Sequence, residues 1–198
     1  MVNTIIVLPR PGTTKSSDAQ PPIQAPSEAA FVATFGKLLP QASYLQTPTG
    51  GAAYYELPAL SSVPPETTNP VSRVLFVHGV QTSALGLQPL ASALSSRFPH
   101  AQCVLVDLWG HGLTDTPIVP HEPALFHTLL VDLMMHLGWD DAHLIGYSFG
   151  GSTTATFAVV HPERVASMVL VAPAGLLYSG EFNELQKSYL RGGEELEE

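Results

Sequence analysis

The chain has 198 residues, enough for one domain with a sizeable core. Hydrophobic residues make up 45% of it and charged residues 13%, which is typical of a buried sheet and excludes a disordered chain. The formal net charge of -9 argues against nucleic acid or an anionic membrane surface as the main partner. No apolar run approaches the roughly 18 residues of a membrane span. Because Cys103 is the single cysteine, an internal disulfide is excluded. We expect a cytoplasmic protein without a metal or other cofactor.

Residues 1–41 are predicted to form an arm ahead of the core. Five prolines lie among Ser, Thr and Gln within residues 9–27, a composition typical of a flexible or extended segment. The segment Ala29–Leu39 is compatible with a short helix. Two strand-like segments, Tyr44–Gln46 and Ala52–Leu57, flank a Thr-Pro-Thr-Gly-Gly turn, which predicts a hairpin at the start of the core.

Apolar strands alternate with helices from residue 71 onward. Strands are predicted at residues 73–77, 102–106, 142–145 and 165–171, and helices at 86–97, 125–137 and 151–160. Near-continuous apolar strands separated by amphipathic helices indicate an α/β fold, in which a mostly parallel sheet carries helices on both faces. We expect a partial core over residues 42–180, incomplete at its C-terminal side. Residues 181–198 are expected to hold the start of a cap-like helix and an acidic tail.

The segment Gly146-Tyr147-Ser148-Phe149-Gly150 carries the strongest functional signal. It lies between a predicted strand and a predicted helix, which is the setting of the G-x-S-x-G nucleophile elbow. Gly146 and Gly150 leave space for a strained turn that lifts the serine hydroxyl above the sheet. Ser148 is therefore the predicted nucleophile. The alternative is an ordinary serine in a glycine-containing loop.

Donors for an oxyanion are predicted beside this serine. Acyl transfer at a serine needs hydrogen-bond donors for the negative oxygen of the intermediate, and one of them usually follows an earlier strand. We predict that the backbone N–H groups of Val80 and Phe149 take this role. Gly79 would permit a tight approach of the backbone, and His78 would shape the site. The alternative for His78-Gly79 is a plain strand-to-helix turn.

Ligands of open α/β sheets bind beyond the carboxyl ends of the strands. Four predicted strand ends should therefore line one rim, namely those at His78-Gly79, Asp107, Ser148 and Ala172-Pro173.

The chain resembles the N-terminal two-thirds of an α/β-hydrolase-fold serine hydrolase, and most closely an esterase or monoglyceride-lipase-like enzyme. The matching segments, in the order of the family, are Val77-His78-Gly79, the D-x-x-G-x-G segment from Asp107 to Gly112, Gly146 to Gly151, and Leu170 to Gly175. The resemblance implies hydrolysis of a small-molecule carboxylic ester through an acyl-enzyme at Ser148. It implies a structural role for Asp107. For His111 a surface or supporting position and a general-base role both stay open.

The family places its catalytic acid and then its histidine after the nucleophile. No histidine follows His161 in the sequence, and His161, at the end of the helix behind the serine, should point away from the site. Glu181 is poorly spaced for the acid. We therefore expect a C-terminally truncated form that lacks the acid and the histidine. The alternative is a non-catalytic, hydrolase-like binding module. An incomplete sheet would also favour self-association through its exposed edge.

Overall fold

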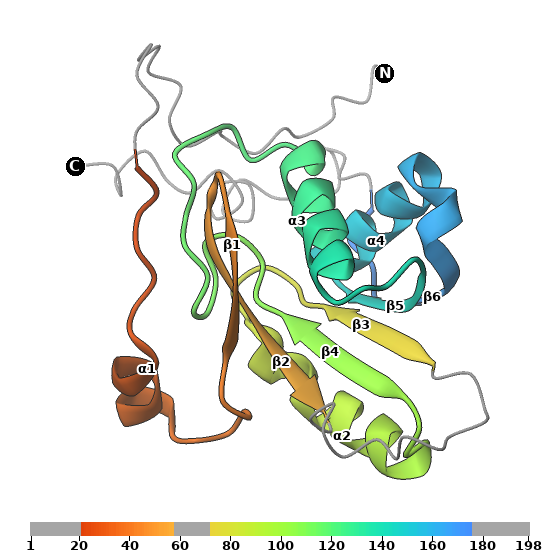
Figure 1. Ribbon diagram of the computed structural model, residues 1–198, viewed down its shortest axis with the longest axis horizontal. Helices are drawn as coiled ribbons and strands as arrows, with labels where there is room; N and C mark the ends of the chain where they lie inside the picture. Colours follow the sequence, from red (N-terminus) through yellow and green to blue (C-terminus); the bar gives the residue numbers. More distant parts are fainter. Residues whose placement is uncertain (1–20, 58–71, 176–198) are drawn as a thin grey trace, which may run out of the picture.

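The computed structural model describes residues 21–57 and 72–175, which form one six-stranded sheet with helices packed on both faces (Figure 1). The strands are β1 (Ser43–Thr47), β2 (Gly50–Leu57), β3 (Arg73–Val77), β4 (Gln102–Val106), β5 (Ala142–Tyr147) and β6 (Val165–Val171). The helices are α1 (Glu28–Phe35), α2 (Gln88–Arg97), α3 (Pro123–His136) and α4 (Phe149–Val160), with short 3-10 turns at Ala84–Leu87 and Pro162–Arg164. The predicted cap-like helix and acidic tail lie outside the described residues.

The strand order in the sheet is β1-β2-β4-β3-β5-β6. Strand β2 pairs antiparallel with both β1 and β4, whereas the pairs β3–β4, β3–β5 and β5–β6 are parallel. The predicted α/β fold, with a mostly parallel sheet and an antiparallel N-terminal hairpin, is therefore confirmed. Each parallel connection passes through a helix, as parallel pairing requires.

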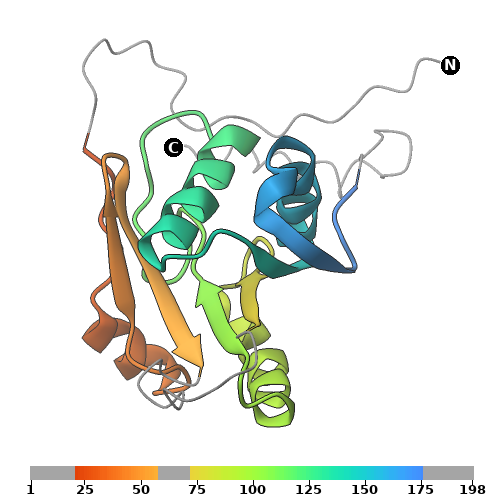
Figure 2. The same ribbon diagram turned by 45° about the vertical axis from the view of Figure 1, so that its right-hand side comes forward.

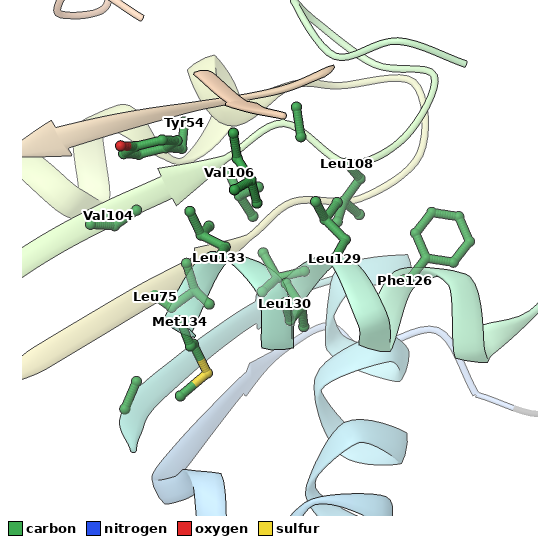
Figure 3. Packing of buried hydrophobic residues seen from close by; sticks show 14 of the residues in the cluster. Tyr54, Leu75, Val104, Val106, Leu108, Phe126, Leu129, Leu130, Leu133 and Met134 are labelled. Atoms are coloured by element: carbon green, nitrogen blue, oxygen red, sulfur yellow. The ribbon is translucent and has the colours of Figure 1, made fainter. Parts of the chain in front are cut away.

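Two apolar layers hold the helices to the sheet. Helices α3 and α4 cover one face, and α2 covers part of the other (Figures 1 and 2). Figure 3 shows the first layer, where Leu130 and Leu133 of α3 meet Leu75 of β3 and Val104 of β4. Each of these side chains is at most 1% exposed. Full burial of a leucine is worth about 1.5–3 kcal/mol, so this contact is a main source of stability.

Two helix boundaries differ from the predicted ones, each for a local structural reason. The helix predicted over residues 86–97 begins as a 3-10 turn capped by the Ser83 hydroxyl, and α2 follows with Pro89 in its first turn. Helix α1 ends at Phe35, earlier than predicted, because Gly36 adopts a φ of 82° and turns the chain away. No helix in the described ranges is both long and apolar enough to cross a membrane.

Residues 21–27, the described part of the proline-rich segment, lie against the loop that follows β4. Ile23 and Thr116 exchange backbone hydrogen bonds of 2.9 and 2.8 Å. The carboxylate of Asp115 accepts from the amides of Ala25, at 2.9 Å, and Gly51, at 2.8 Å. These hydrogen bonds anchor the segment to the core.

Strand β6 is an open edge of the sheet in the part of the chain that the structure describes. Its residues from Ala166 to Val171 are exposed, among them Met168 at 45% and Val169 at 53%. On the α2 side a groove of about 470 Å³ runs beside it, with Phe98, Ile145 and Val169 in its lining. The strand contains no charged residue, and charge is the usual protection of an edge against pairing. We propose that two copies of the chain pair through their β6 strands.

Replacing Met168 by lysine should weaken this self-association at least tenfold, because pairing of the edges would bury the new charge. Sedimentation velocity over a concentration series measures the effect. The matched control is Leu90→Lys, at an apolar position of α2 that is 43% exposed and away from the edge. Equal association of wild type and Met168→Lys, or equal weakening by both variants, would contradict the pairing.

Candidate active site

Ser148 is the single residue between the end of β5 and the start of α4. Its backbone has φ 52° and ψ -119°, a conformation that a residue with a Cβ rarely adopts. Holding it there costs about 1–3 kcal/mol, which the surrounding contacts must offset. The chain thus makes the sharp strand-to-helix turn that the motif predicts, with Ser148 at its apex.

Three glycines around the turn leave no room for a side chain. A Cβ on Gly150 would clash with the carbonyl oxygens of Val77 and His78, where α4 crosses the end of β3. A Cβ on Gly146 would lie 2.5 Å from the Gly150 carbonyl oxygen. A Cβ on Gly79 would lie 2.8 Å from the Ser148 Cβ and 3.3 Å from its Oγ. The glycines therefore bring the β3 loop directly against the serine side chain.

The turn is also held from the β6 side. The Ser148 amide donates to the carbonyl oxygen of Val171 at 3.0 Å, and the Ser148 carbonyl accepts from the Ala174 amide at 2.8 Å. Ala172, between them, has a φ of 42°. The described non-glycine residues with positive φ are Gln81, Ser148 and Ala172, which follow the ends of β3, β5 and β6. Backbone strain in the described chain is thus concentrated at one rim of the sheet, as is common at functional sites.

The two predicted oxyanion donors belong to residues that follow the ends of β3 and β5 at this rim. Phe149 is the first residue of α4, where backbone amides lack partners within the helix and the helix dipole favours negative charge. Its ring packs edge-on against Phe126, with the centroids 5.1 Å apart. Val80 follows Gly79 and is 52% exposed. Within the described residues neither amide has a hydrogen-bond acceptor. Their role as oxyanion donors stays a prediction.

His78 is completely buried beside the rim. Its Nδ1 lies 2.7 Å from the Gly79 carbonyl oxygen, and its Nε2 accepts from the Leu108 amide at 2.9 Å. Burial lowers the pKa of His78 from 6.5 to about 4, although the hydrogen bond to Gly79 raises it and His111 lowers it further. The ring is therefore neutral at neutral pH and joins the loops that follow β3 and β4.

Asp107 joins three further segments by hydrogen bonds. Its carboxylate accepts from the Ala84 amide at 2.7 Å, the Tyr55 hydroxyl at 2.9 Å and the Leu113 amide at 3.0 Å. Burial raises the pKa of Asp107, and these hydrogen bonds oppose the rise. A Cβ on Gly112 would clash with the carboxylate, which explains the glycine of the D-x-x-G-x-G segment. These contacts support the structural role for Asp107.

The other residues considered from sequence lie around this framework. The His111 ring stacks edge-on against His78 at 5.1 Å, and its Nδ1 is 2.9 Å from the Trp109 carbonyl oxygen. Trp109 and Leu108 are at most 2% exposed and belong to the core. His161 follows the last residue of the 12-residue α4, about 18 Å from the end that carries Ser148, and it packs on Phe157. It therefore lies at the opposite end of α4 from Ser148.

Two contributions to the site were not predicted from the sequence. The first is the hydroxyl of Tyr55, which reaches Asp107 from the hairpin strand β2. The second is the hydrogen bond from Ala174 to the Ser148 carbonyl. Both join residues far apart in the chain. No local sequence pattern points to these two pairings.

Ser148 has no hydrogen bond to a histidine or carboxylate side chain within residues 21–57 and 72–175. Ser148 lines neither the groove beside β6 nor a cavity of about 430 Å³ between residues 22–26 and the β1–β2 hairpin. The described residues also contain no group of three or more His, Cys, Asp or Glu placed to hold a metal ion. The described site therefore consists of a strained serine, two predicted backbone donors and the residues that support them.

A mostly parallel sheet with a serine at a strand-to-helix turn defines the class of α/β hydrolases. The family model of the alpha/beta hydrolase fold matches residues 72–193, more than half of the chain. The chain belongs to this family.

Curated relatives and solved structures agree with this membership. The 2-(acetamidomethylene)succinate hydrolase of Mesorhizobium japonicum is 33% identical over 98 residues, which cover 50% of this chain and 34% of that protein. The 2-hydroxy-6-oxo-6-phenylhexa-2,4-dienoate hydrolase of Comamonas testosteroni is 38% identical over 74 residues, or 37% and 26% of the two chains. The carboxylesterase CesB of Bacillus subtilis superposes with a TM-score of 0.55 at 25% identity, covering 74% of this chain and 47% of that one. The chain thus spans between a quarter and about a third of the length of these curated relatives and about half of that solved structure.

Replacing Gly150 by alanine should lower the free energy of unfolding by about 3 kcal/mol or more, because the new methyl group meets two fixed carbonyl oxygens. Gly138→Ala is the matched control: Gly138 has a φ of 68° but open space around it. That variant should lose only the backbone term of about 1–2 kcal/mol. Urea unfolding measures both, and equal losses would show that the close approach at Gly150 does not matter.

Stability should fall in acid through His78. The pKa of His78 is about 4 in the folded protein and near 6.5 in the unfolded chain, so the unfolded chain binds the extra proton between these values. The contribution of the neutral ring is complete above pH 6.5 and falls by about 3 kcal/mol as the pH drops to 4. His78→Asn, which does not titrate, should lose less stability than wild type between pH 7 and 4 in urea titrations. An identical pH dependence in both proteins would contradict the assignment.

Proposed function

We propose that the chain carries the nucleophile half of a serine hydrolase that cleaves small carboxylic esters through an acyl-enzyme. The observation that carries the proposal is the strained turn at Ser148, with the β3 loop packed against its hydroxyl through Gly79. A serine in this conformation is costly to hold in place, and such strain is typical of an active site. Hydrolysis of an epoxide or a haloalkane would need an aspartate as the nucleophile at position 148, and the residue there is serine.

In the proposed reaction the Ser148 Oγ attacks the ester carbonyl carbon and loses its proton to a base. The oxyanion of the tetrahedral intermediate accepts hydrogen bonds from the Val80 and Phe149 amides. Collapse of the intermediate breaks the bond to the alcohol, which leaves with a proton. Water then attacks the acyl group, releases the carboxylic acid and returns the proton to Ser148.

The base and its carboxylate partner are not supplied by the described residues around Ser148. The relatives are two to four times as long as their matched segments, and we propose that the histidine and acid of such a hydrolase lie outside the described residues. Removing members of a triad leaves a residual rate enhancement of about 10³–10⁴ over water. Slow chemistry at Ser148 is therefore expected of this chain.

The choice of an ester rests on the carboxylesterase among the structural neighbours. The relatives include hydrolases of other substrates, among them a dienoate and a succinate derivative. A location in the cytoplasm is part of the same proposal. The single cysteine supports it only in that no disulfide, and so no oxidising compartment, is implied; burial raises the pKa of the Cys103 thiol to about 11, which makes the thiol unreactive.

A second candidate function is a non-catalytic module that binds a ligand or a protein through the hydrolase framework. One observation favours it: within the described residues no acid or base side chain is hydrogen-bonded to Ser148. The two candidates differ in whether the hydroxyl reacts.

A fluorophosphonate probe followed by mass spectrometry distinguishes them. We expect slow covalent labelling of wild type at Ser148 and loss of at least 95% of the label in Ser148→Ala. The control is Ser152→Ala, one turn further along α4, which should label at the wild-type rate. If wild type does not label, the non-catalytic module is the correct reading. Labelling that persists in Ser148→Ala would reject Ser148 as the nucleophile.

A further inference from the structure

Both ring nitrogens of His78 have backbone partners, and these partners determine its tautomer. The Leu108 amide can only donate, so Nε2, at 2.9 Å, must be the acceptor and carries no proton. The Gly79 carbonyl oxygen can only accept, so Nδ1, at 2.7 Å, must carry the proton. The buried ring is therefore held as the neutral tautomer with its proton on Nδ1.

The hydrogen bond from Nδ1 fixes the peptide unit between Gly79 and Val80. A planar trans peptide directs its N–H opposite to its C=O. Because the Gly79 carbonyl is directed at the His78 ring, the Val80 amide points away from that ring. The same Gly79 lies against the Ser148 side chain, where a Cβ would come within 2.8 Å of the Ser148 Cβ. One hydrogen bond thus sets the direction of an amide next to the candidate nucleophile.

We infer that His78 is a positioning residue: its Nδ1–H holds the Gly79 carbonyl and so orients the Val80 amide as an oxyanion donor. The catalytic consequence rests on the function proposed above, whereas the tautomer and the peptide orientation do not. The Leu108 amide anchors the opposite side of the ring to the end of β4, so the loop after β3 is aligned with the sheet.

The charged and titratable groups around the ring are compatible with this role. Asp107 Oδ1 lies 4.0 Å from Nε2, but that carboxylate already accepts from the Ala84, Leu113 and Tyr55 donors. The His111 ring, 5.1 Å away, donates from its own Nδ1 to the Trp109 carbonyl oxygen. Burial lowers the pKa of His78 to about 4, which keeps the ring neutral at neutral pH.

Two amide substitutions separate the functions of the two ring nitrogens. The short side chain of His78→Asn places an N–H donor near the Nδ1 position and gives up the contact with Leu108. The longer side chain of His78→Gln reaches toward the Nε2 position and gives up the donor to Gly79. Each variant loses one hydrogen bond in the same buried site, so a purely structural role of His78 would affect the two similarly.

The first measurement is the rate of fluorophosphonate labelling of Ser148 in wild type and both variants at pH 7. We expect His78→Asn to stay within about fivefold of wild type and His78→Gln to label about 10–100-fold more slowly, as loss of an oriented oxyanion donor predicts. Equal rates in the two variants would overturn the positioning role. Thermal unfolding of both proteins checks that they are folded at the assay temperature.

The second measurement uses the ¹⁵N chemical shifts of the His78 ring and of the Val80 amide. We expect a protonated Nδ1 and an unprotonated Nε2 in wild type, and a shifted Val80 amide in His78→Gln but not in His78→Asn. A proton on Nε2 would overturn the inference. If wild type does not label at all, the proposed function fails and so does the catalytic consequence, but the ring and amide shifts still decide the peptide orientation.

Discussion

The site depends on the absence of side-chain volume where α4 crosses the end of β3. Gly150 faces the carbonyl oxygens of Val77 and His78 so closely that any Cβ would push the helix off the sheet. Gly146, at the other end of the turn, allows a similarly close approach to the Gly150 carbonyl oxygen. Because of this close approach, the first amide of α4 and the loop after β3 lie on either side of one serine. The remaining features of the rim support this arrangement.

Buried polar side chains hold the loops of the rim in place. His78 joins the loop after β3 to the end of β4, and Asp107 joins that end to the hairpin and to the segment at Ala84. Burying either group without hydrogen bonds would cost free energy. Both His78 ring nitrogens and both Asp107 carboxylate oxygens have a hydrogen-bond partner. Removing one member of such a hydrogen-bond network leaves its buried partners unpaired and lowers the stability of the whole network. The positions of the loops at the rim therefore depend on one another. Rigid loops suit a site in which backbone amides must already be oriented before a substrate arrives.

The sequence predicts the strands and helices better than the contacts between distant segments. Strands β3, β4 and β6 have the predicted bounds because each is mainly apolar and the composition changes where it ends, at His78-Gly79, Asp107 and Ala172-Pro173. Helix α1 is shorter than predicted because Gly36 takes a positive φ, which periodicity does not reveal. At the site, the G-x-S-x-G spacing predicts the turn at Ser148. The supports from Tyr55 and Ala174 come from distant segments, and local patterns carry no information on such pairings.

The two apolar layers differ in the spectroscopic and chemical probes they contain. Both tryptophans of the chain, Trp109 and Trp139, belong to the layer that α3 covers, whereas the single cysteine, Cys103, belongs to the layer beneath α2. Indole emission therefore follows water entry on one side of the sheet, and thiol modification follows it on the other. In the wild-type protein the unfolding kinetics of the two layers can therefore be measured separately, without an introduced label.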